Sequence, residues 1–325
     1  MMRAFQFADV SKGLEFKDIP IPTPGKGQVL VQVKATGLCH TDCNVISGKD
    51  DMLFWQRPIT LGHEIAGEIV TLGPDVTQFS IGERVVSGLG VSHPLTIQDV
   101  TTSPGIGYNG GYAEYAVFNV AKTLRIPDGV TFAQAAVATD AIATAYHAVM
   151  VAGHAASSST IAIIGLGGLG LSAVSIAHLV GAKVYGIDID PTKYVVALQS
   201  GALRCAKSLD RFPGTQFDVI VDFAGAGVTT AAAVTAVKPG GRIVLVGLGA
   251  KEATLSTYDF VAQGATLVGS AGSSVGEVEE VLELIAKGKI NPLMEEIPFN
   301  DIAMGLDRLS KGGVLGRLYA DPSKA

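Results

Sequence analysis

Residues Thr160–Asp190 read TIAIIGLGGLGLSAVSIAHLVGAKVYGIDID, and this stretch decides the fold of the surrounding chain. An apolar run of β character, 161–164, leads into the glycine cluster GLGGLG of residues 165–170. A helical segment follows to about Val180, and a second apolar run, 184–187, stops at Asp188. A strand, a glycine-rich turn, a helix and a second strand in this order predict the start of a doubly wound parallel sheet.

The glycines of this cluster have the G-x-G-x-x-G spacing of a dinucleotide site. Gly165 would make the tight turn, Gly167 would let the backbone approach a pyrophosphate, and Gly170 would let the helix pack close to the strand. The diphosphate would lie at the helix N-terminus, where free N–H groups and the helix dipole favour anions. The residues predicted to bind the cofactor here are Gly165, Gly167, Gly168, Leu169 and Gly170.

An acidic residue stands where such a site needs one. Asp188 follows Gly165 by 23 residues, at the end of the second strand, where a carboxylate can accept the hydroxyls of the adenine ribose. The rival interpretation is a membrane span, because residues 161–177 carry no charge over seventeen positions. Glycines crowd one end of that run, and its length falls short of the roughly 20 residues that a span requires. We therefore favour the nucleotide site.

The composition narrows the class of protein. A chain of 325 residues predicts two domains, and 48% hydrophobic with 17% charged residues predicts a large core. A net charge of −6 gives no reason to expect a nucleic acid or an anionic membrane as partner. Three cysteines cannot form a disulfide framework, and residues 1–13 lack the apolar region of a signal peptide. These features predict a cytoplasmic protein.

The chain changes character along its length. Residues 1–125 read as short strands broken by turns, which predicts a compact β barrel with few helices. An Ala-rich helix is expected from Phe132 to about Val151. Strands and helices then alternate, as in a doubly wound sheet. From residue 291 the rhythm is lost, and this tail could return to the first domain.

Three dispersed side chains have the chemistry of a metal site. Zinc favours cysteine sulfur, histidine nitrogen and carboxylate oxygen, and a catalytic zinc keeps three protein ligands and one open position. Cys39, His63 and Asp140 supply such a set, and Glu64 is an alternative ligand beside His63. Asp42 could accept the second ring N–H of His63 and fix its tautomer.

Four motifs carry a resemblance that covers essentially the whole chain. GLCHTD (37–42), GHE (62–64), GERV (82–85) and GLGGLG (165–170) resemble the zinc-dependent alcohol dehydrogenases of the medium-chain dehydrogenase/reductase family. The resemblance implies an α/β protein with a GroES-like β-barrel catalytic domain and a Rossmann cofactor domain with a doubly wound parallel sheet. We place the catalytic domain at 1–146 and 290–325 and the Rossmann domain at 147–289.

The resemblance also implies a role for individual residues. Cys39 and His63 would bind zinc, with Asp140 as the third ligand in a carboxylate variant of the site, and Thr41 would begin a proton relay. NAD would be preferred over NADP, because Asp188 would repel a 2′-phosphate. The further residues implied to contact the cofactor are His40, Thr144, Lys193, Val246, Ser270 and Arg317.

Two departures from the family pattern affect the prediction. Many relatives carry four clustered cysteines for a structural zinc, but residues 87–115 contain none, so one catalytic zinc per chain is expected. In those relatives the lobe that binds the structural zinc often supports subunit contacts. The expected assembly of this chain is a homodimer or homotetramer. The relay usually ends on a histidine five residues after the ligand cysteine, where this chain has Asn44, which cannot carry a proton near neutral pH.

The sequence therefore predicts an NAD-linked zinc alcohol dehydrogenase or carbonyl reductase acting on a small alcohol, aldehyde or ketone. The alternatives are a zinc-free quinone or enone reductase of the same family, an iminium reductase, and a non-catalytic NAD-binding protein. Phe54, Trp55 and Leu89 are candidates for lining an apolar substrate pocket. The identity of the substrate does not follow from the sequence.

Overall fold

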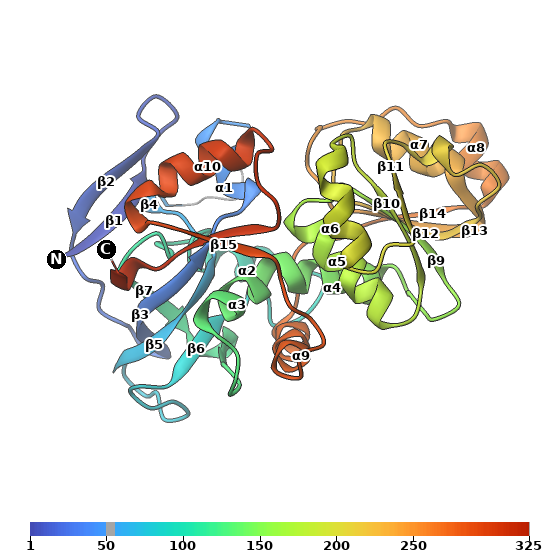
Figure 1. Ribbon diagram of the computed structural model, residues 1–325. Helices are drawn as coiled ribbons and strands as arrows, with labels where there is room; N and C mark the ends of the chain where they lie inside the picture. Colours follow the sequence, from blue (N-terminus) through green and yellow to red (C-terminus); the bar gives the residue numbers. More distant parts are fainter. Residues whose placement is uncertain (50–55, 325) are drawn as a thin grey trace. The chain divides into compact units, whose positions relative to one another are not determined.

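A computed structural model describes residues 1–49 and 56–324 of the chain (Figure 1). Its contacts divide it into two compact units, the first formed by Met1–Ala143 with Gly272–Ala325 and the second by Thr144–Ala271. The boundary lies earlier than the sequence predicted, because residues 272–289 group with the first unit instead of the Rossmann domain. The cause is local: the parallel sheet ends at Gly269, and Val275 then donates its N–H to the carbonyl of Gly90 in the first unit.

The second unit contains the predicted doubly wound sheet. Its six parallel strands follow the order β11-β10-β9-β12-β13-β14, so strands are added outward on both sides of β9. This is the order 3-2-1-4-5-6 of dinucleotide-binding folds. The strands are β9 (Thr160–Ile164), β10 (Lys183–Ile187), β11 (Arg204–Ala206), β12 (Phe217–Asp222), β13 (Val237–Leu245) and β14 (Thr266–Gly269).

Helices connect these strands, as a parallel sheet requires. The strand β9 is a continuous apolar run because such sheets are covered on both faces, and Ile161–Ile164 are all buried. Small residues on α5 let it approach the sheet closely: Ala173 and Ala177 are fully buried. The helical elements are α5 (Gly168–Leu179), η4 (Pro191–Lys193), α6 (Tyr194–Gln199), η5 (Leu209–Arg211), α7 (Val228–Ala236) and α8 (Thr257–Gln263).

The first unit is built mainly from antiparallel strands. A seven-stranded sheet has the order β15-β16-β3-β5-β6-β8, with β7 also paired to β3, and a smaller sheet has the order β2-β1-β4. The strands are β1 (Met2–Phe7), β2 (Leu14–Ile19), β3 (Gln28–Gly37), β4 (Ile59–Thr60), β5 (Glu64–Leu72), β6 (Arg84–Ser87), β7 (Tyr115–Asn119), β8 (Thr123–Arg125), β15 (Met294–Ile297) and β16 (Arg317–Ala320).

The central strand β3 shows why this segment forms a half-buried sheet. Val29, Val31 and Val33 are fully buried, while Gln32 and Lys34 between and after them are half-buried. The three valines pack in a core with Ile65 and Phe118, among others. At its end β3 pairs with β16, so residues that follow the parallel sheet in the chain rejoin the first unit.

Short helices complete the first unit, and one of them starts a longer helical run. They are α1 (His40–Ile46), η1 (Val120–Lys122), α2 (Ile97–Thr101), α3 (Phe132–Val137), η2 (Ala138–Ile142), α9 (Val275–Ala286), η6 (Phe299–Asp301), α10 (Ile302–Ser310) and η7 (Pro322–Lys324). The run 132–152 continues from η2 through α4 (Ala143–Tyr146) and η3 (His147–Ala152). It is long and apolar enough to cross a membrane, but 72% of its apolar window is buried inside the protein, as in a core helix.

Candidate functional site

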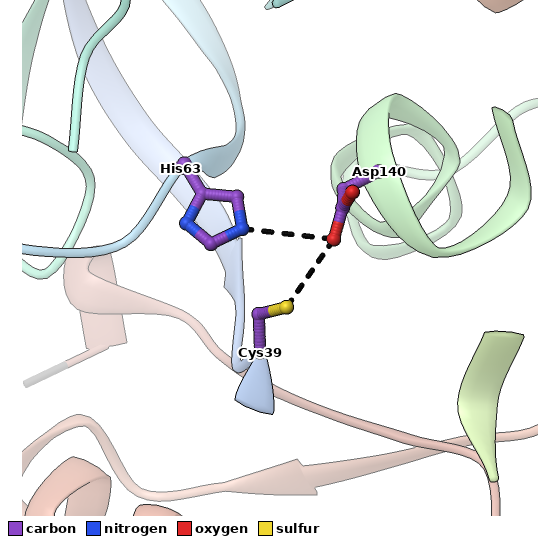
Figure 2. Close-up of side chains that lie close together, drawn as sticks. All are labelled: Cys39, His63 and Asp140. Carbon is purple, nitrogen blue, oxygen red and sulfur yellow. Dashed lines mark hydrogen bonds and ion pairs between the residues drawn. The ribbon is translucent and has the colours of Figure 1, made fainter. Parts of the chain in front are cut away.

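Three of the predicted ligands converge in the first unit (Figure 2). Cys39 is the N-cap of α1, directly after β3; His63 precedes β5; and Asp140 lies in the π-helical turn η2. Asp140 Oδ2 lies 3.3 Å from Cys39 Sγ and 3.6 Å from His63 Nε2. The ends of two strands and one helical turn thus bring together residues that are far apart in the sequence.

This donor set fits a zinc ion. Bonds of about 2.0–2.3 Å place neighbouring ligand atoms of a tetrahedral zinc about 3.3–3.7 Å apart. The two separations at Asp140 have this size, and the ligand atoms of all three residues lie within 4.8 Å of one another. The pair of thiol and imidazole also matches zinc better than the oxygen-only sets that calcium and magnesium prefer.

The second ring nitrogen of His63 faces Asp42. Its Nδ1 lies 3.6 Å from Asp42 Oδ1, and the Asp42 side chain is fully buried at the first turn of α1. Burial alone would lower the pKa of His63, but the carboxylates of Asp42 and Asp140 hold that pKa well above its ordinary value. The pocket therefore favours positive charge at this position, which a metal cation supplies equally well.

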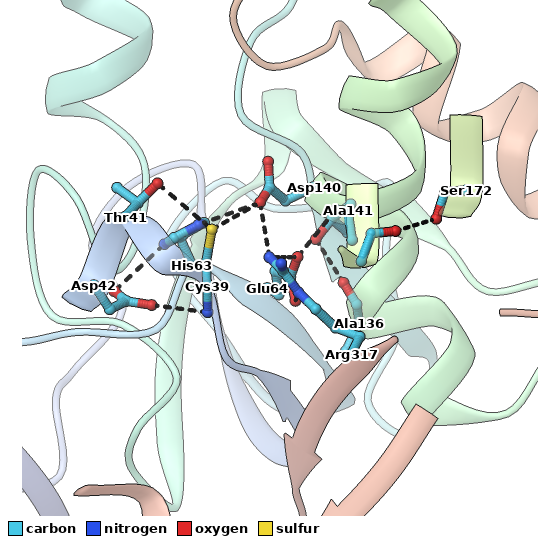
Figure 3. A network of polar contacts seen from close by, with 12 residues as sticks. Cys39, Thr41, Asp42, His63, Glu64, Ala136, Asp140, Ala141, Ser172 and Arg317 are labelled. Atoms are coloured by element: carbon cyan, nitrogen blue, oxygen red, sulfur yellow. Dashed lines mark hydrogen bonds and ion pairs between the residues drawn. The ribbon is translucent and has the colours of Figure 1, made fainter. Parts of the chain in front are cut away.

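Glu64 and Arg317 lie behind the three ligands (Figure 3). Arg317 donates to both oxygens of Glu64, at 2.6 and 3.0 Å, and to Asp140 Oδ2 at 3.1 Å. Arg317 is 4% exposed, and its guanidinium is engaged inside the first unit. Its predicted contact with the cofactor phosphates stays a prediction. Glu64 is held by Arg317 and is not among the three residues whose ligand atoms converge, so its role as an alternative ligand stays a prediction.

The π-helical turn explains how Asp140 reaches the site. Such a turn interrupts the i→i−4 ladder, and Ala141 here donates its N–H to Glu64 Oε1 at 3.0 Å instead of to a helix carbonyl. Glu64 can approach only because Gly37 has no side chain: a Cβ there would lie 1.8 Å from Glu64 Oε2. The glycine of the first motif and the glutamate of the second are therefore parts of one arrangement.

Sequence reasoning missed Tyr112 as a member of the site. Its hydroxyl donates to Asp42 Oδ2 at 2.7 Å, and both side chains are fully buried. The pattern of residues 110–120 predicts only a strand. The one sign in the sequence of a close contact at Tyr112 is the pair of glycines, Gly110 and Gly111, before it.

A small hollow opens beside the ligands. Leu89, predicted to line the pocket, does so together with Ser103 and Ile106. The full lining is His63, Ser87, Gly88, Leu89, Ser103, Pro104, Ile106, Thr139 and Asp140. The two aromatic candidates for this wall, Phe54 and Trp55, lie outside the described residues. The wall combines small hydroxyl side chains with apolar ones.

The glycine cluster has the local geometry of a dinucleotide loop. Gly165 has φ +88°, which only glycine adopts without strain. A Cβ on Gly170 would lie 1.8 Å from the Gly165 carbonyl, so the helix could not approach the strand. A Cβ on Gly167, the N-cap of α5, would meet nothing within 4 Å, which leaves open space for a ligand in front of the first helical N–H groups. These residues fit a bound pyrophosphate.

Asp188 follows β10 at the edge of this loop, and its carboxylate already accepts hydrogen bonds from the protein. It accepts from the N–H of Leu166 at 2.7 Å and of Asp190 at 2.9 Å, and from Lys193 Nζ at 3.2 Å. A carboxylate offers about four acceptor positions, so roughly one remains for a ribose hydroxyl unless Lys193 moves. Lys193 lies next to the acid, and its predicted contact with the cofactor stays a prediction.

The remaining predicted residues have these positions. Thr41 is half-buried, with its hydroxyl 3.5 Å from the Cys39 thiol, and His40 is exposed at the start of α1. In the second unit Thr144 is buried in α4, and Val246 and Ser270 follow β13 and β14 directly. The Ser270 hydroxyl has no hydrogen-bond partner within the described part of the chain. The contacts predicted for these residues with a cofactor stay predictions.

Comparison with known proteins supports the same family along the whole chain. Residues 25–128 match the model of the alcohol dehydrogenase GroES-like domain, and residues 168–287 that of the zinc-binding dehydrogenase. An alcohol dehydrogenase of Geobacillus stearothermophilus is 32% identical over 98% of both chains. An NAD-dependent alcohol dehydrogenase of Sulfurisphaera tokodaii is 30% identical and covers 99% of this chain and 100% of its own.

A solved structure agrees with these matches. The acetophenone reductase of Geotrichum candidum, determined in complex with NAD, superposes with a TM-score of 0.90 and 31% identity over 98% of this chain and 97% of its own. Identity at this level over nearly the full length, with both domain types in the same order, settles the relationship. The chain belongs to the alcohol dehydrogenases of the medium-chain dehydrogenase/reductase family.

Proposed function

We propose that this protein is a zinc-dependent, NAD-linked alcohol dehydrogenase or carbonyl reductase. The observation that carries the proposal is the convergence of Cys39, His63 and Asp140 at the separations a tetrahedral zinc needs. A zinc-free quinone or enone reductase would have no use for this set. Zinc, when bound, polarises the substrate oxygen, and the nicotinamide exchanges a hydride with the substrate carbon.

The side chains around the ligands have distinct tasks in this proposal. Asp42 orients His63 through Nδ1, leaving Nε2 for the metal. Arg317 compensates the negative charge of Glu64 and Asp140 and keeps Asp140 directed at the other two ligands. Thr41, whose hydroxyl lies 3.5 Å from the Cys39 thiol, would accept the proton of a bound alcohol.

The path of that proton beyond Thr41 is unusual. Asn44, at the position of the customary histidine, is half-buried on α1, and an amide cannot accept and release a proton near neutral pH. We infer that the proton leaves by water. The same residue keeps open the second candidate, an iminium or enone reductase, in which less proton transfer passes through this route.

The cofactor is proposed to be NAD, held by the loop 165–170 and by Asp188. The pyrophosphate would lie against the first turn of α5, whose N–H groups lack helix-internal acceptors. Asp188 and Lys193 would contact the adenine ribose, and the negative charge of Asp188 would disfavour a 2′-phosphate. Thr144, Val246 and Ser270 are proposed contacts of the nicotinamide end.

We further propose a homodimer or homotetramer in the cytoplasm. The edge strand β14 pairs only with β13 within the described chain. On nearby α8, Tyr258 and Val261 are 81% and 78% exposed, unusual for an apolar pair on one helix face. The three cysteines are free, in keeping with a reducing compartment.

The test begins with metal content. Protein purified without chelator should contain about one zinc per chain, as one catalytic site predicts. Asp140→Asn keeps the shape of the side chain but removes a charged ligand, so it should lose zinc and activity toward alcohols and aldehydes with NAD. Asp128→Ala, on an exposed position of the same unit, is the control. A wild-type protein that holds no zinc and takes up none would refute the proposal.

A further inference from the structure

Tyr112 occupies a position behind the metal ligands that its sequence context does not explain. The side chain is 0% exposed, and its Oη donates to Asp42 Oδ2 at 2.7 Å. The other oxygen of Asp42 lies 3.6 Å from His63 Nδ1. A buried line of polar atoms therefore runs from the phenol through the carboxylate to the imidazole.

Among the donors to Asp42 that the structure describes, Tyr112 makes the short bond. The N–H of Cys39 lies 3.4 Å from Oδ2, and the N–H of Gly62 lies 3.5 Å from Oδ1. Burial and the facing carboxylate raise the pKa of Tyr112 well above its ordinary value, so the phenol stays protonated and acts as a donor. The orientation of the carboxylate thus depends mainly on this phenol.

The tyrosine ring is fixed by the residue before His63. Gly62 has φ +87°, and a Cβ there would lie 2.5 and 2.7 Å from two ring atoms of Tyr112. The backbones are also joined: Tyr112 donates its N–H to the Leu61 carbonyl at 3.0 Å, and Gly111 donates to the Gly62 carbonyl at 2.7 Å. The ring, the strand entry and the histidine therefore form one rigid piece.

We propose that Tyr112 is a positioning residue for the metal ligand His63. Its hydroxyl holds Asp42 Oδ2, which turns Oδ1 toward Nδ1 and so presents Nε2 to the metal. The inference rests on the proposed zinc site and adds to it a residue outside the ligand set. A partner of a metal ligand, here Asp42, acts through the orientation and basicity of that ligand, and its loss weakens the metal complex. Tyr112 acts on this partner.

The test measures release of the metal and not turnover. Zinc-loaded wild type and Tyr112→Phe are mixed with excess chelator, and zinc release is followed over time. We expect about tenfold faster release from Tyr112→Phe, the lower end of the effect of partners behind the ligands. In cobalt-substituted protein the d–d absorption bands should shift, because the histidine is held less firmly.

The matched control is Tyr108→Phe. Tyr108 lies four residues before Tyr112 in the chain, but its hydroxyl donates to the carbonyl of Val117 at 3.0 Å and not to Asp42 within the described part of the chain. It should release zinc at the wild-type rate. In an Asp42→Asn background the effect of Tyr112→Phe should largely vanish, because the group through which the phenol acts has changed.

The outcomes separate the two proposals. A wild type without zinc refutes the proposed function, whereas zinc-loaded Tyr112→Phe that releases metal at the wild-type rate, with unchanged cobalt bands, refutes only the role of Tyr112. If Tyr112→Phe does not fold, difluorotyrosine at position 112 preserves ring and hydroxyl while strengthening the donor. Slower release of zinc from the difluorotyrosine protein than from the wild type supports the role of Tyr112, and an unchanged release rate overturns it.

Discussion

Arg317 and Glu64 form a bidentate ion pair although 253 residues separate them in the chain. Neither side chain is more than 5% exposed, and the same guanidinium also reaches Asp140. Buried pairs of this kind add little over an apolar pair, but removing one partner leaves the other charged and unpaired. The last strand of the first unit therefore completes the support of the metal site.

Arg317→Met should destabilise the protein by about 3–5 kcal/mol, because it leaves Glu64 buried without its cation. The control is Arg308→Met, whose pair with Glu295 has the same kind of contact at 2.7 Å but is 41% and 46% exposed. That change should cost less than about 1 kcal/mol. Urea unfolding of the three proteins measures both values, and equal losses would contradict the importance of the buried pair.

The loss in Arg317→Met should depend on pH. Burial, with Asp140 nearby, raises the pKa of Glu64 to about 7 even though Arg317 opposes the shift, and without Arg317 it should rise further. The folded-state pKa then lies above the unfolded value, so the folded protein binds the extra proton and stability falls as pH rises. We expect Arg317→Met to be less impaired at pH 5.5 than at pH 8, as checked by urea unfolding at both, and a larger impairment at pH 5.5 would show the sign to be wrong.

Asp188→Ala should relax the preference for NAD over NADP. The change removes the negative charge that would face a 2′-phosphate. It also frees Lys193, whose Nζ lies 3.2 Å from the Asp188 carboxylate in the wild type, to attract that phosphate. The ratio of kcat/KM values for the two cofactors measures the effect, with Asp210→Ala, an exposed aspartate of the same unit, as the control. An unchanged ratio would remove Asp188 from the cofactor site.

Lys122→Met should loosen the segment that carries part of the hollow wall. The ammonium is 3% exposed and donates to the Asp99 carbonyl at 2.6 Å, Thr102 Oγ1 at 2.9 Å and Ser103 Oγ at 3.1 Å. We expect a loss of about 3 kcal/mol, since several buried acceptors lose a charged donor. Limited proteolysis should cleave residues 95–104 faster in Lys122→Met than in the wild type. The KM for the alcohol or carbonyl substrate should rise.

The matched control for this change is Lys26→Met. Lys26 pairs with Asp75, and their side chains are 79% and 70% exposed. Its removal should change neither proteolysis nor stability by a measurable amount. If Lys122→Met resists proteolysis as well as this control does, Lys122 does not organise residues 95–104. This segment lacks the cysteines that many relatives carry there.

Asn44→His should raise alcohol oxidation near neutral pH if the missing relay histidine limits the rate. Asn44 is half-buried on α1, at most two turns after Cys39. The pH profile of kcat between 6 and 9, compared with Asn44→Gln, separates proton transfer from a change of shape. Absence of any gain would mean that water already carries the proton fast enough.

The sequence predicted local features best. The loop 165–170 and Asp188 form one strand–turn–helix–strand unit, so spacing along the chain was enough to place them. The alternation of strands and helices predicted the doubly wound parallel sheet, whose strand order comes from the structure. The proposed metal ligands were inferred from their chemistry and from resemblance, because Cys39 and Asp140 are 101 residues apart and no local spacing connects them.

What escaped prediction depends on contacts between distant segments. The pairing of β16 with β3 brings Arg317 to Glu64, and no local pattern in the sequence indicates that contact. Tyr112 contacts Asp42, 70 residues away in the chain, and the only local sign of this contact in the sequence was the pair of glycines before the tyrosine. The boundary near residue 272 depended on which unit α9 packs against, and an amphipathic helix does not reveal its partner in its own sequence.

The discontinuous first unit has a consequence for synthesis on the ribosome. At about 5–20 residues per second, roughly 13 to 50 seconds pass between the emergence of Glu64 and that of Arg317, 253 residues later. During this interval the parallel-sheet unit, contained within Thr144–Ala271, can fold by itself, while the earlier unit still lacks β16. Nascent chains should therefore acquire the ability to retain nucleotide before they acquire the ability to retain metal.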